Sequence, residues 1–259
     1  MTLLEVRSIS KSFGGVSAIK EVSLTIREGE IVGLIGPNGA GKTSFFNCVT
    51  GLIPIDSGEI LFSGTGGQEN RFRLNGLSPN KIMGKGIART FQNLRIFKNM
   101  TLLENVSIGF HSRTKSGIWD AFIGTKRLKV EEKKIFTKSM ELLQFVGLES
   151  QSNETAGNLC YGSQKRLEIA RALACEPKLL LLDEPVAGMN LTEKEEITVL
   201  VRQIRQKNIA VLLIEHDMRV VMPLSDRVIV MDEGKKIAEG SPAQVQSDPR
   251  VIAAYLGES

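Results

Sequence analysis

The sequence lacks the features that mark a small secreted domain or a membrane-spanning protein. Its 259 residues include only three cysteines, Cys48, Cys160 and Cys175, an odd number without paired spacing. Such cysteines suit a reduced cytosolic protein better than a disulfide scaffold or a zinc site. The purely apolar runs, such as residues 179–182, are far too short to cross a bilayer. The first ten residues lack a basic start followed by a long apolar stretch, so we expect neither a signal peptide nor a membrane span.

A strong charge of either sign is also missing. The 33 lysines and arginines exceed the 29 aspartates and glutamates by a net charge of +4, and they are scattered along the chain. This pattern indicates a solvated basic surface, and we expect no nucleic-acid partner. Apolar residues make up 42% of the chain, which is enough for the buried core of one large domain or two small ones.

Strand patterns dominate the first part of the chain, and helix and strand patterns alternate in the last part. The segments LLEVRSI, VSLTI, EIVGLIG and GEILFSG predict strands. Residues 63–80 are polar and rich in glycine, which predicts a surface loop. From Tyr161 onward, a parallel sheet covered by helices is predicted by the order RLEIARALA, KLLLLD, TEKEEITVLVRQIRQ, IAVLLIE and RVIVMD.

The middle of the chain predicts a helical insertion near residues 95–160. Thr101, with Glu104 three positions later, forms the capping-box pattern of a helix start. Residues 129–148 repeat apolar side chains at helical spacing, and Gly147 is expected to end that helix. The sequence therefore predicts an α/β core with a β-rich N-terminal part and a helical insertion.

The segment EIVGLIGPNGAGKTSFFN carries a phosphate-binding pattern. Residues 36–43, GPNGAGKT, match G-x-x-x-x-G-K-[ST] between a predicted strand and a predicted helix, the context that the motif requires. Glycines let successive backbone N–H groups point at phosphate oxygens, and the helix adds its positive N-terminal end. Lys42 can reach the β- and γ-phosphates, and the Thr43 hydroxyl can ligate Mg²⁺. The motif indicates a nucleoside triphosphate site, but alone it does not separate kinases, GTPases, helicases and transporters.

Two acidic residues end the segment KLLLLDEP. A buried strand would place Asp183 at the edge where open α/β sheets bind ligands, in direct or indirect contact with Mg²⁺. Glu184 can orient or deprotonate an attacking water, although such a pair standing alone would be read as a helix cap. A GTPase would be expected to carry an N-K-x-D motif, which is missing from the sequence, and a small-molecule kinase does not need this general base.

Two further polar residues stand where a nucleotide could be sensed. His216 follows the apolar strand pattern AVLLIE, at the ligand edge of the predicted sheet. Gln92, in GIARTFQNLRIF, lies at the junction with the helical insertion, where its side-chain carbonyl could ligate Mg²⁺ or hold water. Either residue alone would be read as structural or as surface, and the other motifs favour a functional role. The second histidine, His111, is predicted to be a solvated loop residue.

In this order, the phosphate loop, Gln92, the turn LCYGSQ before KRLEIARAL, LLLLDEP and His216 resemble an ABC-type ATPase domain over essentially the whole chain. The resemblance implies an α/β P-loop fold with a RecA-like core, an N-terminal antiparallel β-subdomain and a helical subdomain. Residues 1–240 would form the ATPase domain, with the helical subdomain near 95–162 inserted in it, and 241–259 a tail packed on the core. ATP and Mg²⁺ are the implied ligands, with Thr43, Gln92 and Asp183 at the metal. The nucleotide would be bound by the adenine-stacking Phe13 and by Gly36, Pro37, Asn38, Gly39, Ala40, Gly41, Lys42, Thr43 and Ser44.

The resemblance also implies that LCYGSQ is the signature turn, which binds the γ-phosphate of ATP held by a second copy in a head-to-tail dimer. The helix after Gly162 would offer N–H groups and a positive dipole end to the anion. Cys160 stands where the family usually has serine, and Ser163 where it often has Gln or Glu, so we expect a working but slower ATPase that is sensitive to thiol reagents. The segment VAGMN matches the interface-crossing D-loop, with Asn190 where Asp is common. The contacting residues of the signature would be Cys160, Tyr161, Gly162, Ser163 and Gln164.

In the implied cycle, Lys42 and Gln92 act on the bound nucleotide, Glu184 positions the water, and His216 steadies the transition-state charge.

Several segments resemble the ATP-binding subunits of branched-chain amino acid importers in particular. They are GIARTFQNLRIFKNMTLLENV, the Tyr-Gly signature, VAGMN, the long stretch from His111 to Lys134 and the tail GSPAQVQSDPRVIAAYLG. Urea or amide uptake, lipopolysaccharide export and a soluble ABC ATPase without a transport role are the alternatives. The resemblance implies a second ATPase subunit, identical or paralogous, two transmembrane permease subunits and, indirectly, an external binding protein. It places the chain peripherally on the cytoplasmic face of the membrane.

Overall fold

The computed structural model describes residues 1–64, 71–110 and 126–256, without the side chains of 126–129 and 256. The chain divides into two compact units, of which unit 1 comprises Met1–Arg89 and Lys178–Ser259, and unit 2 comprises Thr90–Pro177. No helix in the described ranges is long and apolar enough to cross a membrane.

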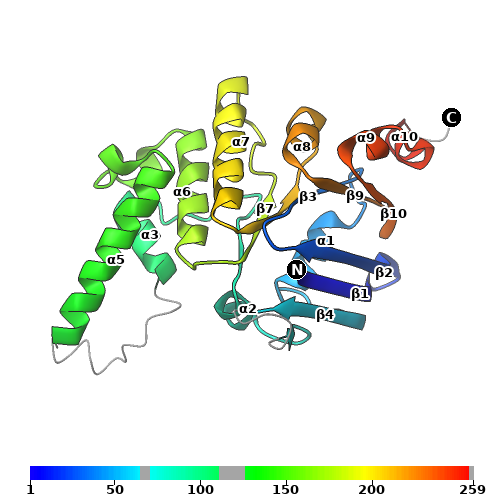
Figure 1. Cartoon of the computed structure of the whole chain (residues 1–259), viewed down its shortest axis with the longest axis horizontal. Coiled ribbons are helices and arrows are strands. Elements are labelled where there is room, and N and C mark those ends of the chain that lie inside the picture. The colour runs from blue at the N-terminus through cyan, green and yellow to red at the C-terminus, as the bar shows by residue number, and fades with distance from the viewer. Residues whose placement is uncertain (65–70, 111–125, 257–259) are drawn as a thin grey trace. The chain divides into compact units, whose positions relative to one another are not determined.

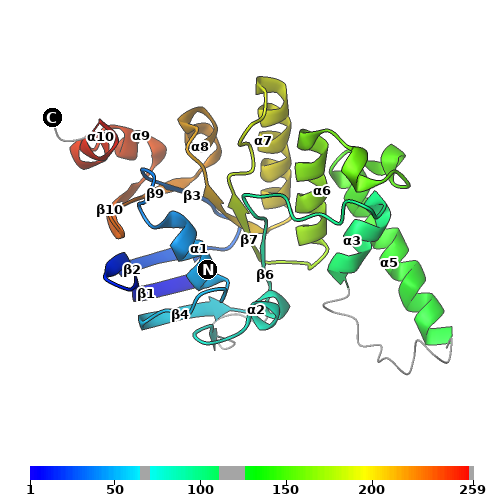
Figure 2. The ribbon, with the colours of Figure 1, turned by 180° about the vertical axis from the view of Figure 1, so that it is seen from behind.

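Unit 1 contains an antiparallel sheet and a mainly parallel sheet (Figure 1). The antiparallel sheet has the order β2-β1-β4-β5, formed by β1 (Thr2–Phe13), β2 (Val16–Arg27), β4 (Ser57–Ser63) and β5 (Arg71–Arg73). The second sheet has the order β10-β9-β3-β8-β7-β6, and only β10 runs antiparallel to its neighbour. Its strands are β3 (Ile31–Ile35), β6 (Ile87–Arg89), β7 (Leu179–Asp183), β8 (Ala210–Ile214), β9 (Arg227–Asp232) and β10 (Lys235–Gly240). Figure 2 shows the short β6 beside β7 at one edge.

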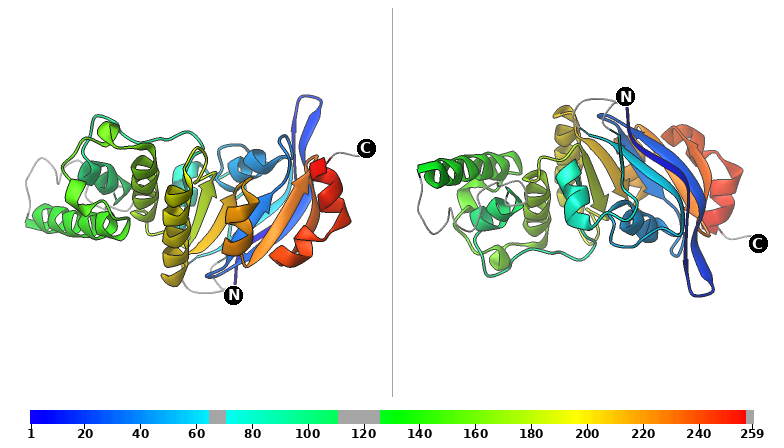
Figure 3. Two further views of the ribbon diagram at one scale, coloured as in Figure 1. Left: turned by 90° about the horizontal axis from the view of Figure 1, so that it is seen from above. Right: turned by 90° about the horizontal axis from the view of Figure 1, so that it is seen from below.

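Both faces of the parallel sheet are buried, which explains why its strands are continuous apolar runs. On β9, Ile229 and Met231 belong to a core shared with the antiparallel sheet, whereas Val228 and Val230 pack into a second core with the last helices of the chain. Figure 3 shows the corresponding arrangement of unit 1, with α1 on one face of the sheet and α7 to α10 on the other. The phosphate loop and both predicted strand-end acids therefore project from a rigid layer.

The helices of unit 1 start where the sequence supplies caps. The side chains of Asn190 and Glu193 form a capping box at the start of α7, and those of Ser241 and Gln244 form one at the start of α9. The tail packs on the second core through Val245 and Val251. The bounds are α1 (Lys42–Val49), α2 (Pro79–Lys85), α7 (Leu191–Gln206), α8 (Met218–Leu224), α9 (Pro242–Gln246) and α10 (Pro249–Leu256).

The predicted loop over residues 63–80 is wrong in part, because Arg71–Arg73 form the edge strand β5 and α2 starts at Pro79. Phe72 lies opposite Phe62 and packs against the core, while Arg71 and Arg73 point outward to Glu5 and Glu59. Because two of the three residues of β5 are arginines, its composition is that of a polar loop, and a strand pattern of alternating polar and apolar residues is too short to recognise. Residues 65–70 lie outside the described part.

Unit 2 is helical and contains α3 (Leu102–Phe110), α5 (Lys126–Phe145) and α6 (Tyr161–Leu173), with short 3₁₀ turns at Glu149–Gln151 and Ala156–Asn158. The predicted capping box is confirmed, since the Thr101 hydroxyl accepts from the Glu104 N–H at 3.2 Å and the Glu104 carboxylate accepts from the Thr101 N–H at 2.8 Å. Gly147, with φ of 71°, follows α5 in the left-handed conformation that glycine favours.

Candidate functional site

The phosphate loop connects β3 to α1 in unit 1, and two of its glycines are required by space as well as by conformation. A Cβ on Gly36 would lie 2.0 Å from the carbonyl oxygen of Met231, and one on Gly41 would lie 2.3 Å from that of Ala18. Gly41 is also the N-cap of α1, with φ of 97° and no side-chain cap. The first N–H groups of α1 therefore point out of the helix end toward an anion site.

Lys42 bends back over the loop that precedes it. Its ammonium donates hydrogen bonds to the carbonyl oxygens of Gly36 at 2.6 Å and Pro37 at 2.9 Å. Burial lowers the pKa of Lys42, while the carboxylates of Glu184 and Asp183 act in the opposite direction. A half-buried ammonium of this kind is stabilised strongly by a phosphate, because the charge-assisted hydrogen bond offsets its desolvation.

Asp183 ends β7 and is buried, but it is already engaged in an ion pair. Its Oδ2 accepts from the Arg89 guanidinium at 2.6 Å, and the two side chains are only 3% and 6% exposed. The same guanidinium donates to Asn47 Oδ1 on α1 at 2.6 Å and lies 5.4 Å from the centre of the Phe46 ring. Arg89 thus fixes the acid relative to the helix that follows the phosphate loop.

The oxygen donors near the loop fit Mg²⁺. This ion prefers oxygen ligands, and in phosphate-transferring sites it takes one or two from the protein and the rest from phosphates and water. Thr43 in the first turn of α1 and Asp183 at the end of β7 supply a hydroxyl and a carboxylate. No cluster of three or more His, Cys, Asp or Glu side chains that could hold a metal occurs within the described ranges.

Glu184 and His216 extend from the ends of the adjacent strands β7 and β8. The His216 Nδ1 lies 4.0 Å from Glu184 Oε1, and the imidazole is 64% exposed. Glu184 adopts φ of 47°, an unusual value for a residue other than glycine, and its N–H donates to the carbonyl of Ile214 at 2.9 Å. Strained conformations of this kind are often retained where they aim a side chain.

Glu215, immediately before His216, is a buried carboxylate that sequence reasoning missed. Its Oε1 accepts from the Val186 N–H at 2.9 Å, and its Oε2 accepts from the His216 N–H at 3.2 Å. Burial raises the pKa of Glu215, and these backbone hydrogen bonds oppose the rise. The signal that could have revealed Glu215 in the sequence is an acidic residue that stands directly between an apolar strand pattern and His216.

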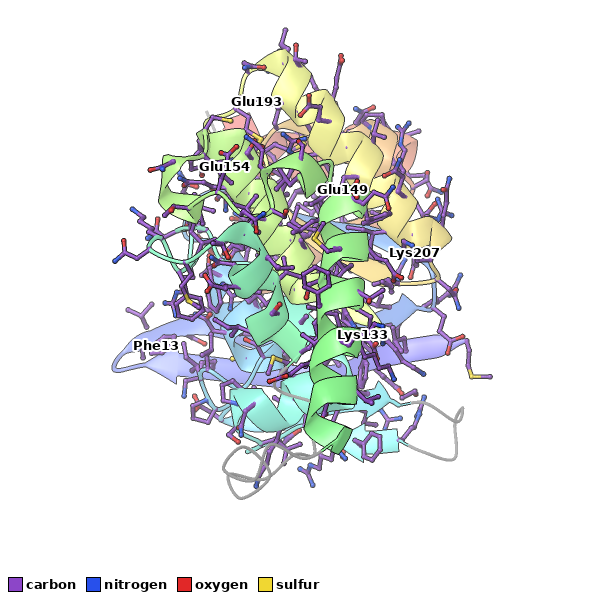
Figure 4. The ribbon with its side chains drawn as sticks, turned by 90° about the vertical axis from the view of Figure 1, so that its left-hand side faces the viewer. Phe13, Lys133, Glu149, Glu154, Glu193 and Lys207 are labelled. Carbon is purple, nitrogen blue, oxygen red and sulfur yellow. The ribbon has the colours of Figure 1, made fainter. Side chains whose placement is uncertain are left out.

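Phe13 and Asn190, two positions taken from the family resemblance, lie at exposed ends of elements in unit 1. Phe13 is the last residue of β1, at the hairpin tip in Figure 4; its side chain is 45% exposed, with Lys11 Nζ 5.5 Å from the ring centre. Asn190 caps α7, and its side-chain oxygen accepts from the Glu193 N–H at 3.0 Å. Since Asn and Asp are equally good N-caps, the departure from the family's Asp preserves the helix start.

In unit 2, a buried ion pair holds the backbone at Gln92. Lys165 and Glu168 on α6 are 1% and 2% exposed and lie 3.4 Å apart. The Lys165 ammonium donates to the carbonyls of Phe91 at 2.9 Å and Gln92 at 3.2 Å, while Glu168 accepts from the Phe91 and Arg95 N–H groups. Gln92 is exposed just after β6, and its backbone is thereby tied to the helix that carries the predicted signature.

The predicted signature turn forms the start of α6, which begins at Tyr161 and not after Gly162. Cys160 is the exposed N-cap, and its thiol donates to Ser163 Oγ at 3.3 Å. Ser163 is buried, and its hydroxyl also accepts from Arg166 at 3.0 Å, so it is turned away from the solvent side of the turn. Gln164 closes the turn by donating to the Leu159 carbonyl at 3.0 Å.

Sequence reasoning also missed Arg89 and the Lys165–Glu168 pair. Arg89 stands three residues before Gln92 at the end of β6, and only the neighbouring position of β7 in the sheet reveals its partner. Lys165 and Glu168 stand within the predicted helix KRLEIARAL, and both are buried. His111 lies outside the described residues.

Comparison with known proteins agrees with this architecture. Residues 19–187 match the family model of the ABC transporter, and residues 235–259 match that of the branched-chain amino acid ATP-binding cassette transporter. The chain is 34% identical to a nucleotide-free ATP-binding cassette of an ABC transporter, with a TM-score of 0.85 and complete coverage of both chains. The ADP conformation of MJ1267, another such cassette, gives a TM-score of 0.84 at 34% identity with complete coverage of both chains.

Fold, phosphate loop and matches together define a nucleotide-binding P-loop ATPase. The chain belongs to the ABC transporter ATP-binding family, as the match over residues 19–187 and its curated relatives establish. It is 41% identical to the high-affinity branched-chain amino acid transport ATP-binding protein LivG of Salmonella typhimurium, over 99% of this chain and 98% of the relative. It is 40% identical to BraF of Pseudomonas aeruginosa, a protein described in the same words, over the same shares of the two chains.

Proposed function

We propose that this ATPase powers the import of branched-chain amino acids. The observation that carries the proposal is the match of the C-terminal residues 235–259 to the branched-chain amino acid cassette model, together with near-complete coverage of LivG and BraF. The chain would act as a peripheral subunit on the cytoplasmic face of the membrane, bound to two permease subunits. Residues 1–240 would form the ATPase domain, with the helical subdomain near 95–162 as the part that meets the permeases.

ATP is the substrate of the proposed site in unit 1. Lys42 and the first N–H groups of α1 would bind the β- and γ-phosphates, with Phe13 against the adenine. Mg²⁺, which neutralises phosphate charge when bound, would be held in unit 1 by Thr43 and Asp183, and Gln92 remains a further metal ligand that the family resemblance implies. Glu184 would orient and deprotonate the attacking water, and His216 would donate to the charge that develops on the γ-phosphate.

A second ATPase subunit, identical or paralogous, would complete each site. Its signature turn would close over the γ-phosphate with the N-terminal end of its α6. The exposed Cys160 and Tyr161 flank the start of that helix, which supports a role in contacting another chain.

Reconstitution tests this proposal. The chain is expressed with two hydrophobic permease subunits in proteoliposomes, and ATP hydrolysis is measured with an external binding protein and different solutes. We expect stimulation of at least severalfold by the binding protein loaded with leucine, isoleucine or valine, and none by urea or simple amides. Stimulation by urea or an amide, or hydrolysis that ignores the permeases altogether, would contradict the proposal.

Cys160→Ser is expected to leave ATP hydrolysis equal or to raise it by up to about tenfold. A hydroxyl is a stronger hydrogen-bond donor than a thiol, and one bond to a charged group contributes about 1.5–3 kcal/mol. Serine is also a preferred N-cap for α6. Steady-state ATPase rates of the reconstituted variant and the parent protein are compared; a sharp loss of activity would show that the turn is assigned wrongly.

ATP should also shield Cys160 from alkylation, in a background where Cys48 and Cys175 are replaced by alanine. Cys48 and Cys175 are buried, and burial raises the pKa of Cys48 to about 11, so neither competes strongly for the reagent even in the parent protein. Equal alkylation rates with and without ATP would place Cys160 outside the nucleotide interface.

A further inference from the structure

Glu215 is a fully buried carboxylate that none of the roles above uses. Its side chain is 0% exposed, and its two oxygens accept from the N–H groups of Val186 and His216. Among the residues that the structure describes, its only ion-pair partner within 4.0 Å is His216, whose Nδ1 lies 3.9 Å from Oε2. A buried carboxylate without a lysine or arginine is costly, and its backbone hydrogen bonds must offset that cost.

The position of Glu215 links two segments that carry the proposed chemistry. Strands β7 and β8 are adjacent and parallel, and their ends deliver Glu184 and His216 to the same edge of the sheet. Directly after β7, the Glu184 N–H donates to the carbonyl of Ile214, the last residue of β8, and the Val186 N–H donates to the Glu215 carboxylate. The second of these hydrogen bonds depends on a side chain, that of Glu215.

We propose that Glu215 is a positioning residue for ATP hydrolysis, which holds Glu184 and His216 in register by accepting from the N–H of Val186, two residues after Glu184, and from the N–H of His216 itself. The inference rests on the proposed function, in which Glu184 activates water and His216 contacts the γ-phosphate. Because Val186 opens the segment VAGMN, the same carboxylate also ties the start of the predicted interface segment to the histidine. Glu215 touches neither nucleotide nor water in this role.

Two variants test the role in the reconstituted transporter. Glu215→Gln keeps the shape but offers one acceptor oxygen, so its NH₂ group faces an N–H donor and one of the two bonds is lost. Glu215→Asp keeps both oxygens but is one methylene too short to reach both donors, and it serves if the glutamine variant does not fold. For both, we expect kcat to fall about tenfold or more while the Kd for ATP, measured with a fluorescent analogue, stays within about twofold.

Glu30→Gln is the matched control. Glu30 Oε2 accepts from the Arg27 N–H at 2.8 Å just before β3, at the opposite end of the sheet. Replacing the Glu30 carboxylate by an amide should lower the melting temperature of the protein without lowering kcat. A fall in kcat in the control as large as that in the Glu215 variants would mean that Glu215 acts through general stability, and would overturn the inference.

A double-mutant cycle with His216→Ala separates the inference from the function on which it rests. The Glu215 replacements are repeated in the His216→Ala background, and the rate of single-turnover hydrolysis of radiolabelled ATP is measured. If Glu215 acts by placing His216 and Glu184, its replacement should lower that rate by much less than tenfold in this background. Full multiplication of the two effects, or wild-type kcat in both Glu215 variants, would overturn the positioning role. Near-normal hydrolysis by His216→Ala and Glu184→Gln alone would instead overturn the proposed function.

Discussion

Glu184→Gln is expected to lower ATP hydrolysis by about 10²–10⁴-fold while ATP remains bound, because a positioned general base contributes on that order to the rate. The amide preserves the shape of the side chain and the backbone at φ of 47°, but it cannot take a proton from water. Binding through Lys42 and the N-terminal end of α1 does not involve this carboxylate directly. Hydrolysis is measured with radiolabelled ATP and binding with a fluorescent analogue.

The same variant should accumulate as a closed dimer when ATP is added, because two subunits can close over the bound ATP but cannot hydrolyse it to reopen. Size-exclusion chromatography with light scattering measures the mass of the particle. We expect this mass to double when ATP is added and to stay unchanged when ADP is added. Glu233→Gln provides the control, since Glu233 is also a strand-end glutamate with positive φ, at 43°, and it is exposed after β9. Near-normal ATP hydrolysis by Glu184→Gln would show that Glu184 is not the general base.

Local signals predicted most of the elements and the parts of the site that lie within one segment. The phosphate loop was readable because its glycines serve local needs, such as the left-handed Gly41 at the start of α1. The helix caps at Thr101 and the stop at Gly147 were readable for the same reason. The strand ends at Asp183 and His216 followed from apolar runs that are buried on both faces.

The parts that the sequence did not predict are contacts between distant segments. Arg89 meets Asp183 because β6 and β7 are neighbours, although 94 positions separate the two residues in the chain. Glu215 meets Val186 only because β7 and β8 run in parallel with their ends level. Such pairs depend on strand order and register, which a single sequence does not specify.

One departure from the family was more informative in the structure than in the sequence. In the sequence, Cys160 and Ser163 are two separate departures from the residues that the family usually has in the signature turn. The thiol donates to the Ser163 hydroxyl, which is buried and also accepts from Arg166. The pair therefore stabilises the first turn of α6, and Cys160 alone faces solvent, which concentrates the expected functional effect on Cys160.

Lys42→Met is expected to weaken ATP binding on the order of 100-fold and to abolish measurable hydrolysis. Charge-assisted hydrogen bonds contribute about 1.5–3 kcal/mol each, and every 1.4 kcal/mol corresponds to a factor of ten in affinity. The ammonium also donates to the Gly36 and Pro37 carbonyls, so the substitution removes these two hydrogen bonds as well. Methionine keeps the length of the side chain and removes only the charge and the donors.

The nucleotide series makes this prediction specific. A lysine that reaches the β- and γ-phosphates should matter for ATP and ADP, and it should matter little for AMP. Lys236→Met, which removes an exposed lysine paired with Glu239 elsewhere in unit 1, should leave all three affinities unchanged. Competition against a fluorescent nucleotide gives the three dissociation constants for each variant. An equal loss for AMP would mean that the loop collapses without Lys42, and that the lysine supports the loop's shape more than it binds phosphate.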